Sequence, residues 1–167
     1  IEAADYAPAL LTPAEAAAQT EKFAKFRALA TTRGNPERGR ELFTAVCLAC
    51  HQQGGKGGQI APALDGVAHT GIEALLRNLL TPSAAMESAY QTFRVVMKDG
   101  SVLDGFLAGQ DADAVVLRLP GAADRRIARP EIRQASYVRR SLMPEGLLEA
   151  FSPEQVTDLF ALLKSLK

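Results

Sequence analysis

Hydrophobic residues recur at helical spacing in four segments of the chain. The clearest stripe lies near the end of the sequence and consists of Val156, Leu159, Phe160, Leu163 and Leu166. A second strong stripe precedes Pro82 and consists of Ile72, Leu75, Leu76, Leu79 and Leu80. The pattern predicts helices over about residues 12–33, 35–50, 70–81 and 152–166.

Capping residues mark the ends of these helices. Three helices open with the spacing of a capping box, at Thr12 with Glu15, Thr70 with Glu73, and Ser152 with Gln155. Asn35 before Pro36 is a good N-cap for the remaining helix, and Gly34 can close the first one.

The first helix is mostly alanine and charge, and its apolar stripe is thin. Only Phe23, Phe26 and Ala30 lie on that stripe. We therefore expect residues 1–34 to form a helical extension or linker, which either docks weakly on the rest of the chain or connects to an upstream domain.

Between about residues 91 and 137 the pattern becomes strand-like. Asp99-Gly100 lies between two β-prone runs, which is a strong hairpin signal, and shorter runs follow near residues 114–119 and 125–128. Four or five strands do not fit inside a helical core, so residues 91–137 are expected to form an inserted β module. The remaining residues, 35–90 and 138–167, would form one helical domain. The predicted fold class is mainly α with an inserted small antiparallel β module.

Composition limits the class of partner. The 167 residues suffice for one core, and 19 basic residues balance 19 acidic ones. This balance argues against nucleic acid or an anionic membrane surface as partner. No apolar stretch approaches the roughly 20 residues of a membrane-spanning helix. The chain starts at Ile1 without a leader, so we interpret it as a processed product or a piece of a longer protein.

Cys47, Cys50 and His51 account for both cysteines and for one of the two histidines. Two thiols three residues apart on a helical turn can each add to one vinyl group of a porphyrin, and the adjoining imidazole can ligate the iron. The motif predicts one covalently attached haem c, with His51 as proximal ligand. Because such attachment takes place outside the cytoplasm in bacteria and suits an oxidising compartment, we infer a periplasmic protein.

Three alternative roles fit these residues less well. A zinc site would need four ligands, and only His69 could join the motif. A redox dithiol favours a helix N-terminus, whereas this pair follows a helical run. A structural disulfide would not require the adjoining histidine.

The second axial ligand decides whether the iron binds other molecules or only transfers electrons, because a thioether occupies its sixth coordination position and raises its reduction potential. Met86, Met97 and Met143 compete for this position. Met97 lies in the expected hairpin and Met86 just follows a helix. Met143 lies in an irregular stretch before the last helix and is followed by Pro144, so it is the predicted distal ligand. We expect His69 to be a surface or turn residue and not an iron ligand.

A glycine-rich loop, residues 52–58, follows the motif. The order of motif, glycine loop, Pro62-Ala-Leu64, helix, Met143-Pro144 and closing helix resembles a class I cytochrome c. The segments 80–90, 98–100 and 141–147 sharpen this likeness. They resemble the haem-binding domain of the Planctomycete and Verrucomicrobium type, which carries a β insertion and is often appended to PQQ-type sugar dehydrogenases. The resemblance covers about residues 35–166.

The resemblance implies a cytochrome c fold with Cys47 and Cys50 as thioether anchors, and with His51 and Met143 as the metal ligands. It also makes the Pro62 carbonyl the partner of the His51 ring, although Ala61 stands where a glycine is usual. The implied partner is a redox protein or a fused dehydrogenase domain.

The leading interpretation is therefore a low-spin electron carrier that is not itself an enzyme. The alternative is a ligand-binding sensor or peroxidase-like site with a displaceable distal ligand. A third possibility makes the β insertion the working part, through arginines that grip haem propionates or an acidic partner, or bind RNA as some small barrels do. These arginines are Arg125, Arg126, Arg129, Arg133, Arg139 and Arg140. Without interleaved aromatic residues, we expect a solvated face or a propionate contact and no nucleic acid.

Overall fold

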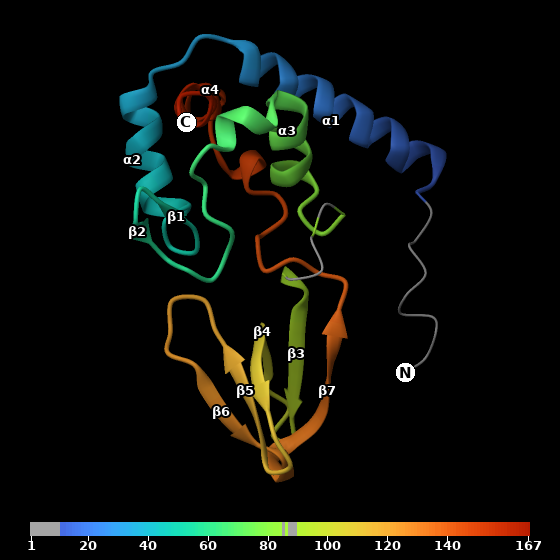
Figure 1. The fold of residues 1–167 in the computed structure, drawn as a ribbon. Helices are drawn as coiled ribbons and strands as arrows, with labels where there is room; N and C mark the ends of the chain where they lie inside the picture. Colours follow the sequence, from blue (N-terminus) through green and yellow to red (C-terminus); the bar gives the residue numbers. More distant parts are fainter. Residues whose placement is uncertain (1–10, 85, 87–89) are drawn as a thin grey trace.

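The structure is a computed structural model that describes residues 11–84, 86 and 90–167. Figure 1 shows helices in the upper part of the view and a sheet in the lower part. The helices are α1 (Pro13–Thr31), α2 (Pro36–Val46), α3 (Ile72–Leu80) and α4 (Pro153–Leu163). Three 3₁₀ turns are η2 (Val67–Thr70), η4 (Arg129–Glu131) and η5 (Leu148–Ala150). The strands are β1 (Gln52–Gln53), β2 (Lys56–Gly57), β3 (Thr92–Met97), β4 (Val102–Gln110), β5 (Ala114–Arg118), β6 (Arg125–Ala128) and β7 (Ile132–Val138).

Most of the expected helix starts are confirmed. Thr12 with Glu15 and Ser152 with Gln155 form reciprocal capping boxes, and the Asn35 side chain accepts from the first turn of α2. The capping box expected at Thr70 is wrong. Its hydroxyl donates to the Val67 carbonyl inside η2, and Gly71 becomes the N-cap of α3.

The helices bury one hydrophobic core. We call the part of the chain that lies outside the segment from β3 to β7 the helical unit. This core contains the apolar stripes of α3 and α4 together with Phe26, Ala30, Phe43 and Leu148. Because Phe26 and Ala30 are buried, α1 is packed against α3 and α4. Two surface ion pairs also hold α1, because Arg27 pairs with Glu73 on α3 and Lys22 pairs with Glu149 in η5.

Two glycines allow the chain to approach α4 closely. A Cβ at Gly34 would lie 2.2 Å from the Thr157 carbonyl oxygen, and one at Gly39 would lie 2.1 Å from that of Asp158. Gly34 thus serves packing, and α1 ends with Thr32 as its C-cap. Helix α2 can cross α4 only where it carries no side chain.

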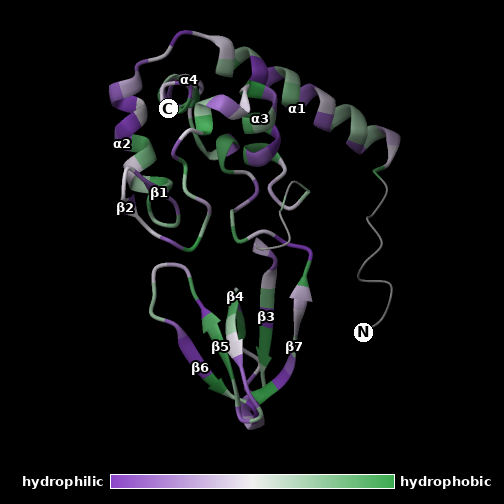
Figure 2. Ribbon diagram, viewed as in Figure 1, coloured by the Kyte–Doolittle hydropathy of each residue, from purple (hydrophilic) through white to green (hydrophobic). Residues whose placement is uncertain are grey.

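Strands β3–β7 form one antiparallel sheet in the order β6-β5-β4-β3-β7, which we call the sheet unit. The hairpin predicted at Asp99-Gly100 is confirmed, with Val96 paired to Val102 across the turn. One face of the sheet buries a second core of Phe93, Val95, Met97, Val115, Leu117 and Ile127. Figure 2 shows hydrophobic residues recurring in both units.

The predicted fold class is wrong, because the structure is not mainly α with a small β module. Of the described residues, 40% are helical and 23% are in strands, and the sheet has five strands with a core of its own. The sequence predicted four or five strands, but it did not predict that β4 continues through Gly105 and Gly109 as far as Gln110. Gly105 is needed because a Cβ there would lie 2.4 Å from the Arg118 carbonyl oxygen on β5.

Candidate haem site

The two cysteines lie on one turn directly after α2. The Cys47 amide donates to the Phe43 carbonyl at 2.8 Å, which continues the helical pattern. The amides of Cys50 and His51 both donate to the Cys47 carbonyl, at 3.2 and 2.9 Å. The turn therefore brings two thiols and an imidazole together, and the thiols are not joined in a disulfide.

The protonation of Cys47 argues against a redox dithiol. Burial, and next the neighbouring Cys50, raises the pKa of the Cys47 thiol from 9.0 to about 11. A catalytic dithiol needs a lowered pKa, because the thiolate is the reactive form. Among the described residues, no group of three or more His, Cys, Asp or Glu side chains could hold a metal ion.

The imidazole of His51 is oriented by a backbone contact. Its Nδ1 lies 2.7 Å from the Pro62 carbonyl oxygen, the contact that the resemblance implied. A carbonyl oxygen can only accept, so Nδ1 is the donor in this contact, and a neutral ring in this tautomer has on Nε2 the lone pair that an iron ligand needs.

The glycine loop wraps around the cysteine turn and satisfies its carbonyl groups. The Gly58 amide at the end of the loop donates to the Leu48 carbonyl at 2.8 Å, and the Ala61 amide just beyond the loop donates to the Cys50 carbonyl at 3.0 Å. Within this loop, β1 and β2 form a short hairpin that the sequence did not predict. Gly57 has φ of 106°, and a Cβ there would lie 2.2 Å from the His51 carbonyl oxygen. The loop can lie this close only because it carries glycine.

The three methionines have different surroundings. Met97 is 6% exposed inside the core of the sheet unit. Met86 is half-buried and lies next to residues 85 and 87–89, which are outside the described part of the chain. Met143 is half-buried and packs against the core of the helical unit, as Cys47 does. Of the three, Met143 therefore shares a hydrophobic cluster with the attachment motif.

The residues present fit a covalently bound haem. Two free thiols lie on one turn, the imidazole has one nitrogen engaged and one available, and a methionine packs on the same core. Half-buried apolar side chains of Leu48, Leu64, Val67 and Leu147 pack on this core as well. Such side chains suit a large apolar ring with an open edge.

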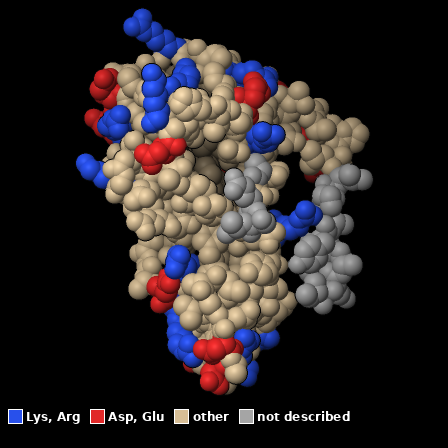
Figure 3. Space-filling model, viewed as in Figure 1, with Lys and Arg blue, Asp and Glu red and all other residues tan. Residues whose placement is uncertain are grey.

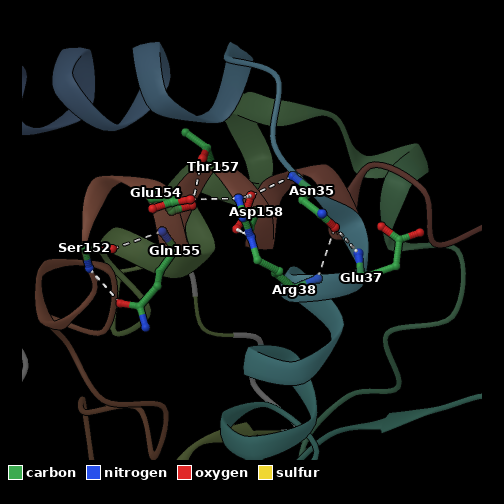
Figure 4. Close-up of polar contacts among 8 residues, drawn as sticks. All are labelled: Asn35, Glu37, Arg38, Ser152, Glu154, Gln155, Thr157 and Asp158. Carbon is green, nitrogen blue, oxygen red and sulfur yellow. Dashed lines mark hydrogen bonds and ion pairs between the residues drawn. The ribbon is translucent and has the colours of Figure 1, made fainter.

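A polar network that the sequence did not predict fixes α2, and with it the motif. Asp158 on α4 is 4% exposed. Its carboxylate accepts from the backbone amide of Asn35 at 2.6 Å and from Arg38 Nε at 2.7 Å. The hydrogen bond from Arg38, and next that from Asn35, lowers the pKa of Asp158 below its ordinary value. Figure 4 shows these groups converging between the starts of α2 and α4. The only sequence signal was a polar pair, Thr157-Asp158, inside an apolar run.

The arginines of the sheet unit are in part engaged with their own unit. Arg126 pairs with Asp111, and Arg129 donates to the Asp111 carbonyl and to Gln110. On the face shown in Figure 3, basic and acidic side chains intermix, and no broad area carries one sign. These contacts weaken the idea of an arginine surface for RNA.

The sequence model of the cytochrome c family matches residues 36–117. This range contains α2, the Cys47–His51 motif, the glycine loop and α3, and then runs into the sheet as far as β5. The match supports a class I cytochrome c. No curated protein matches the chain.

A cytochrome c domain supports a haem-binding, electron-carrying role and implies haem c and a redox partner. Cytochrome c domains generally lie outside the cytoplasm. In the described part of the chain, no helix is both long enough and apolar enough to cross a membrane.

Proposed function

We propose that the chain is a low-spin, mono-haem c-type cytochrome in which Cys47 and Cys50 carry the haem. His51 and Met143 are the axial ligands, and the chain accepts electrons from a redox enzyme or a fused dehydrogenase domain. The observation that supports this most is the 2.7 Å contact between His51 Nδ1 and the Pro62 carbonyl. It leaves the other ring nitrogen free, on a turn that also carries both thiols.

Each residue has a distinct task in this proposal. The haem supplies one-electron redox chemistry when it is bound. Cys47 and Cys50 fix its position, and the Pro62 carbonyl holds the Nδ1 proton, which orients the imidazole and raises its basicity. The half-buried apolar side chains around the motif exclude water and so favour a ligand set that does not rearrange during electron transfer.

In the proposed organisation, residues 35–90 and 138–167 would form the haem domain and residues 91–137 the insertion, and the two separate hydrophobic cores support this division. Residues 1–34 would form an N-terminal helical extension that packs on the haem domain through Phe26 and Ala30. In the wider setting, covalent haem attachment implies a periplasmic location, and the resemblance implies a dehydrogenase of the PQQ type as donor. The chain itself would carry electrons and catalyse no reaction.

Absorption spectra of the ferric and ferrous protein test the axial ligands. The protein is produced in bacteria that mature c-type cytochromes, together with Met143→Ala and, as matched control, Met86→Ala. We expect low-spin spectra from the wild type and from Met86→Ala, and a high-spin or water-ligated ferric spectrum from Met143→Ala. A wild-type ferrous protein that readily binds carbon monoxide would overturn the proposal in favour of a sensor.

A further inference from the structure

Two serines connect the backbone of Met143 to the end of α3. The Met143 amide donates to the Ser141 hydroxyl oxygen at 3.1 Å. The Ser141 amide in turn donates to the Ser83 hydroxyl oxygen at 3.2 Å. Both hydrogen bonds are half-buried, and the second joins residues that are 58 positions apart in the sequence.

The position of Ser83 is well determined by its own surroundings. Helix α3 ends where the Thr81 amide donates to the Arg77 carbonyl at 3.0 Å, and the buried Pro82 then stops the helix. The Ala84 amide closes the following turn on the Thr81 carbonyl at 3.0 Å. Ser83 therefore sits on a hydrogen-bonded turn that directly follows the core residues Leu79 and Leu80.

Ser141 lies where the chain returns from the sheet unit. Strand β7 ends at Val138, so the segment that leads to Met143 is held on one side by the pairing of β7 with β3. Without the contact to Ser83, we expect the segment to follow movements of the sheet. The two serine contacts tie it instead to the same unit that carries Cys47 and His51.

We propose that Ser83 and Ser141 are positioning residues that hold Met143 on the distal side of the haem. This inference rests on the proposed function, because it takes Met143 as an axial ligand. Each serine oxygen accepts from a backbone amide that would otherwise lose its partner. The predicted consequence is that removal of either hydroxyl lets Met143 leave the iron more readily.

Imidazole competes with a thioether for ferric haem, so its apparent affinity measures how firmly Met143 is held. A neutral hydrogen bond of ordinary strength corresponds to about a two- to tenfold change in an equilibrium constant. We expect Ser83→Ala and Ser141→Ala to bind imidazole about two- to tenfold more tightly than the wild type. Ser83→Thr keeps the hydroxyl and should bind it as the wild type does.

The titration uses the full haem-loaded chain, and only preparations that are low-spin before imidazole is added are scored. The matched control is Ser165→Ala, because Ser165 also makes a half-buried hydroxyl contact but lies near the end of α4. Wild-type affinity in Ser83→Ala and Ser141→Ala would overturn this inference while leaving Met143 as the ligand. A wild-type spectrum identical to that of Met143→Ala would instead overturn the proposed function itself.

Discussion

Gly39 lies where α2 crosses α4, and the substitution Gly39→Ala tests this packing. A Cβ at this position would lie 2.1 Å from the carbonyl oxygen of Asp158, 2.7 Å from its carbonyl carbon and 3.2 Å from the Leu159 amide nitrogen. All three atoms belong to the backbone of α4, so no flexible side chain can move aside. The two helices would have to separate.

The expected magnitude combines two opposing effects. Overpacking of a well-packed core typically costs about 1–3 kcal/mol, and contacts this close to backbone favour the upper end. Replacement of glycine by alanine inside a helix stabilises the helix by about 1 kcal/mol. We therefore expect Gly39→Ala to lower the free energy of unfolding by about 2 kcal/mol. Separation of the helices would also weaken the hydrogen bond from Asn35 to Asp158.

Urea unfolding followed by far-UV circular dichroism measures this change. The matched control is Gly109→Ala in the sheet unit, because a Cβ at Gly109 meets no atom within 4 Å. We expect the control to stay within about 0.5 kcal/mol of the wild type. A Gly39→Ala variant as stable as the wild type would refute the argument that this crossing requires glycine.

Three further substitutions test other parts of the structure. The hydrogen bond from Arg38 lowers the pKa of Asp158 in the folded state, so its stabilisation is present above the unfolded pKa and lost as pH falls through the folded pKa. Urea titrations from neutral pH to about pH 2 should therefore show that the free energies of unfolding of Asp158→Asn and of the wild type converge in acid. A difference in free energy that stays constant with pH would contradict this. Phe26→Ala should lower the free energy of unfolding by about 3 kcal/mol because Phe26 is buried, whereas the exposed Leu11→Ala should change little; equal effects would show that α1 is not part of the core. Gly57→Ala should reduce the haem content per chain, measured by the ratio of haem to peptide absorbance, because its φ and the close backbone beside it exclude a side chain; a normal ratio would refute this.

The sequence predicted the helical unit well, because local signals specify its elements. Thr12, Asn35 and Ser152 cap the helices as expected, and the stripes of α3 and α4 are buried. These features depend on residues within one or two turns of each other. The failure at Thr70 has a local cause too, since its hydroxyl bonds to the preceding 3₁₀ turn.

The features that the sequence did not predict depend on residues far apart in the chain. The need for glycine at position 105 becomes clear only when β5 is placed beside β4. Asp158 interrupts an apolar run, and its burial is explained by hydrogen bonds from Arg38 and from the backbone amide of Asn35, which lie 120 and 123 positions away. The chemistry proposed for the site and the contacts that support the site differ in how local they are. The motif from Cys47 to His51 is contiguous in the sequence, whereas the contacts that hold it come from distant segments.

The measurement that tests the central claim most directly is the intact mass of the protein under denaturing conditions, after export in a strain that matures c-type cytochromes. The proposal predicts the mass of the polypeptide plus one haem, and a variant with alanine at both Cys47 and Cys50 should show the mass of the polypeptide alone. A wild-type protein that is colourless and has the mass of the bare polypeptide would contradict the proposal.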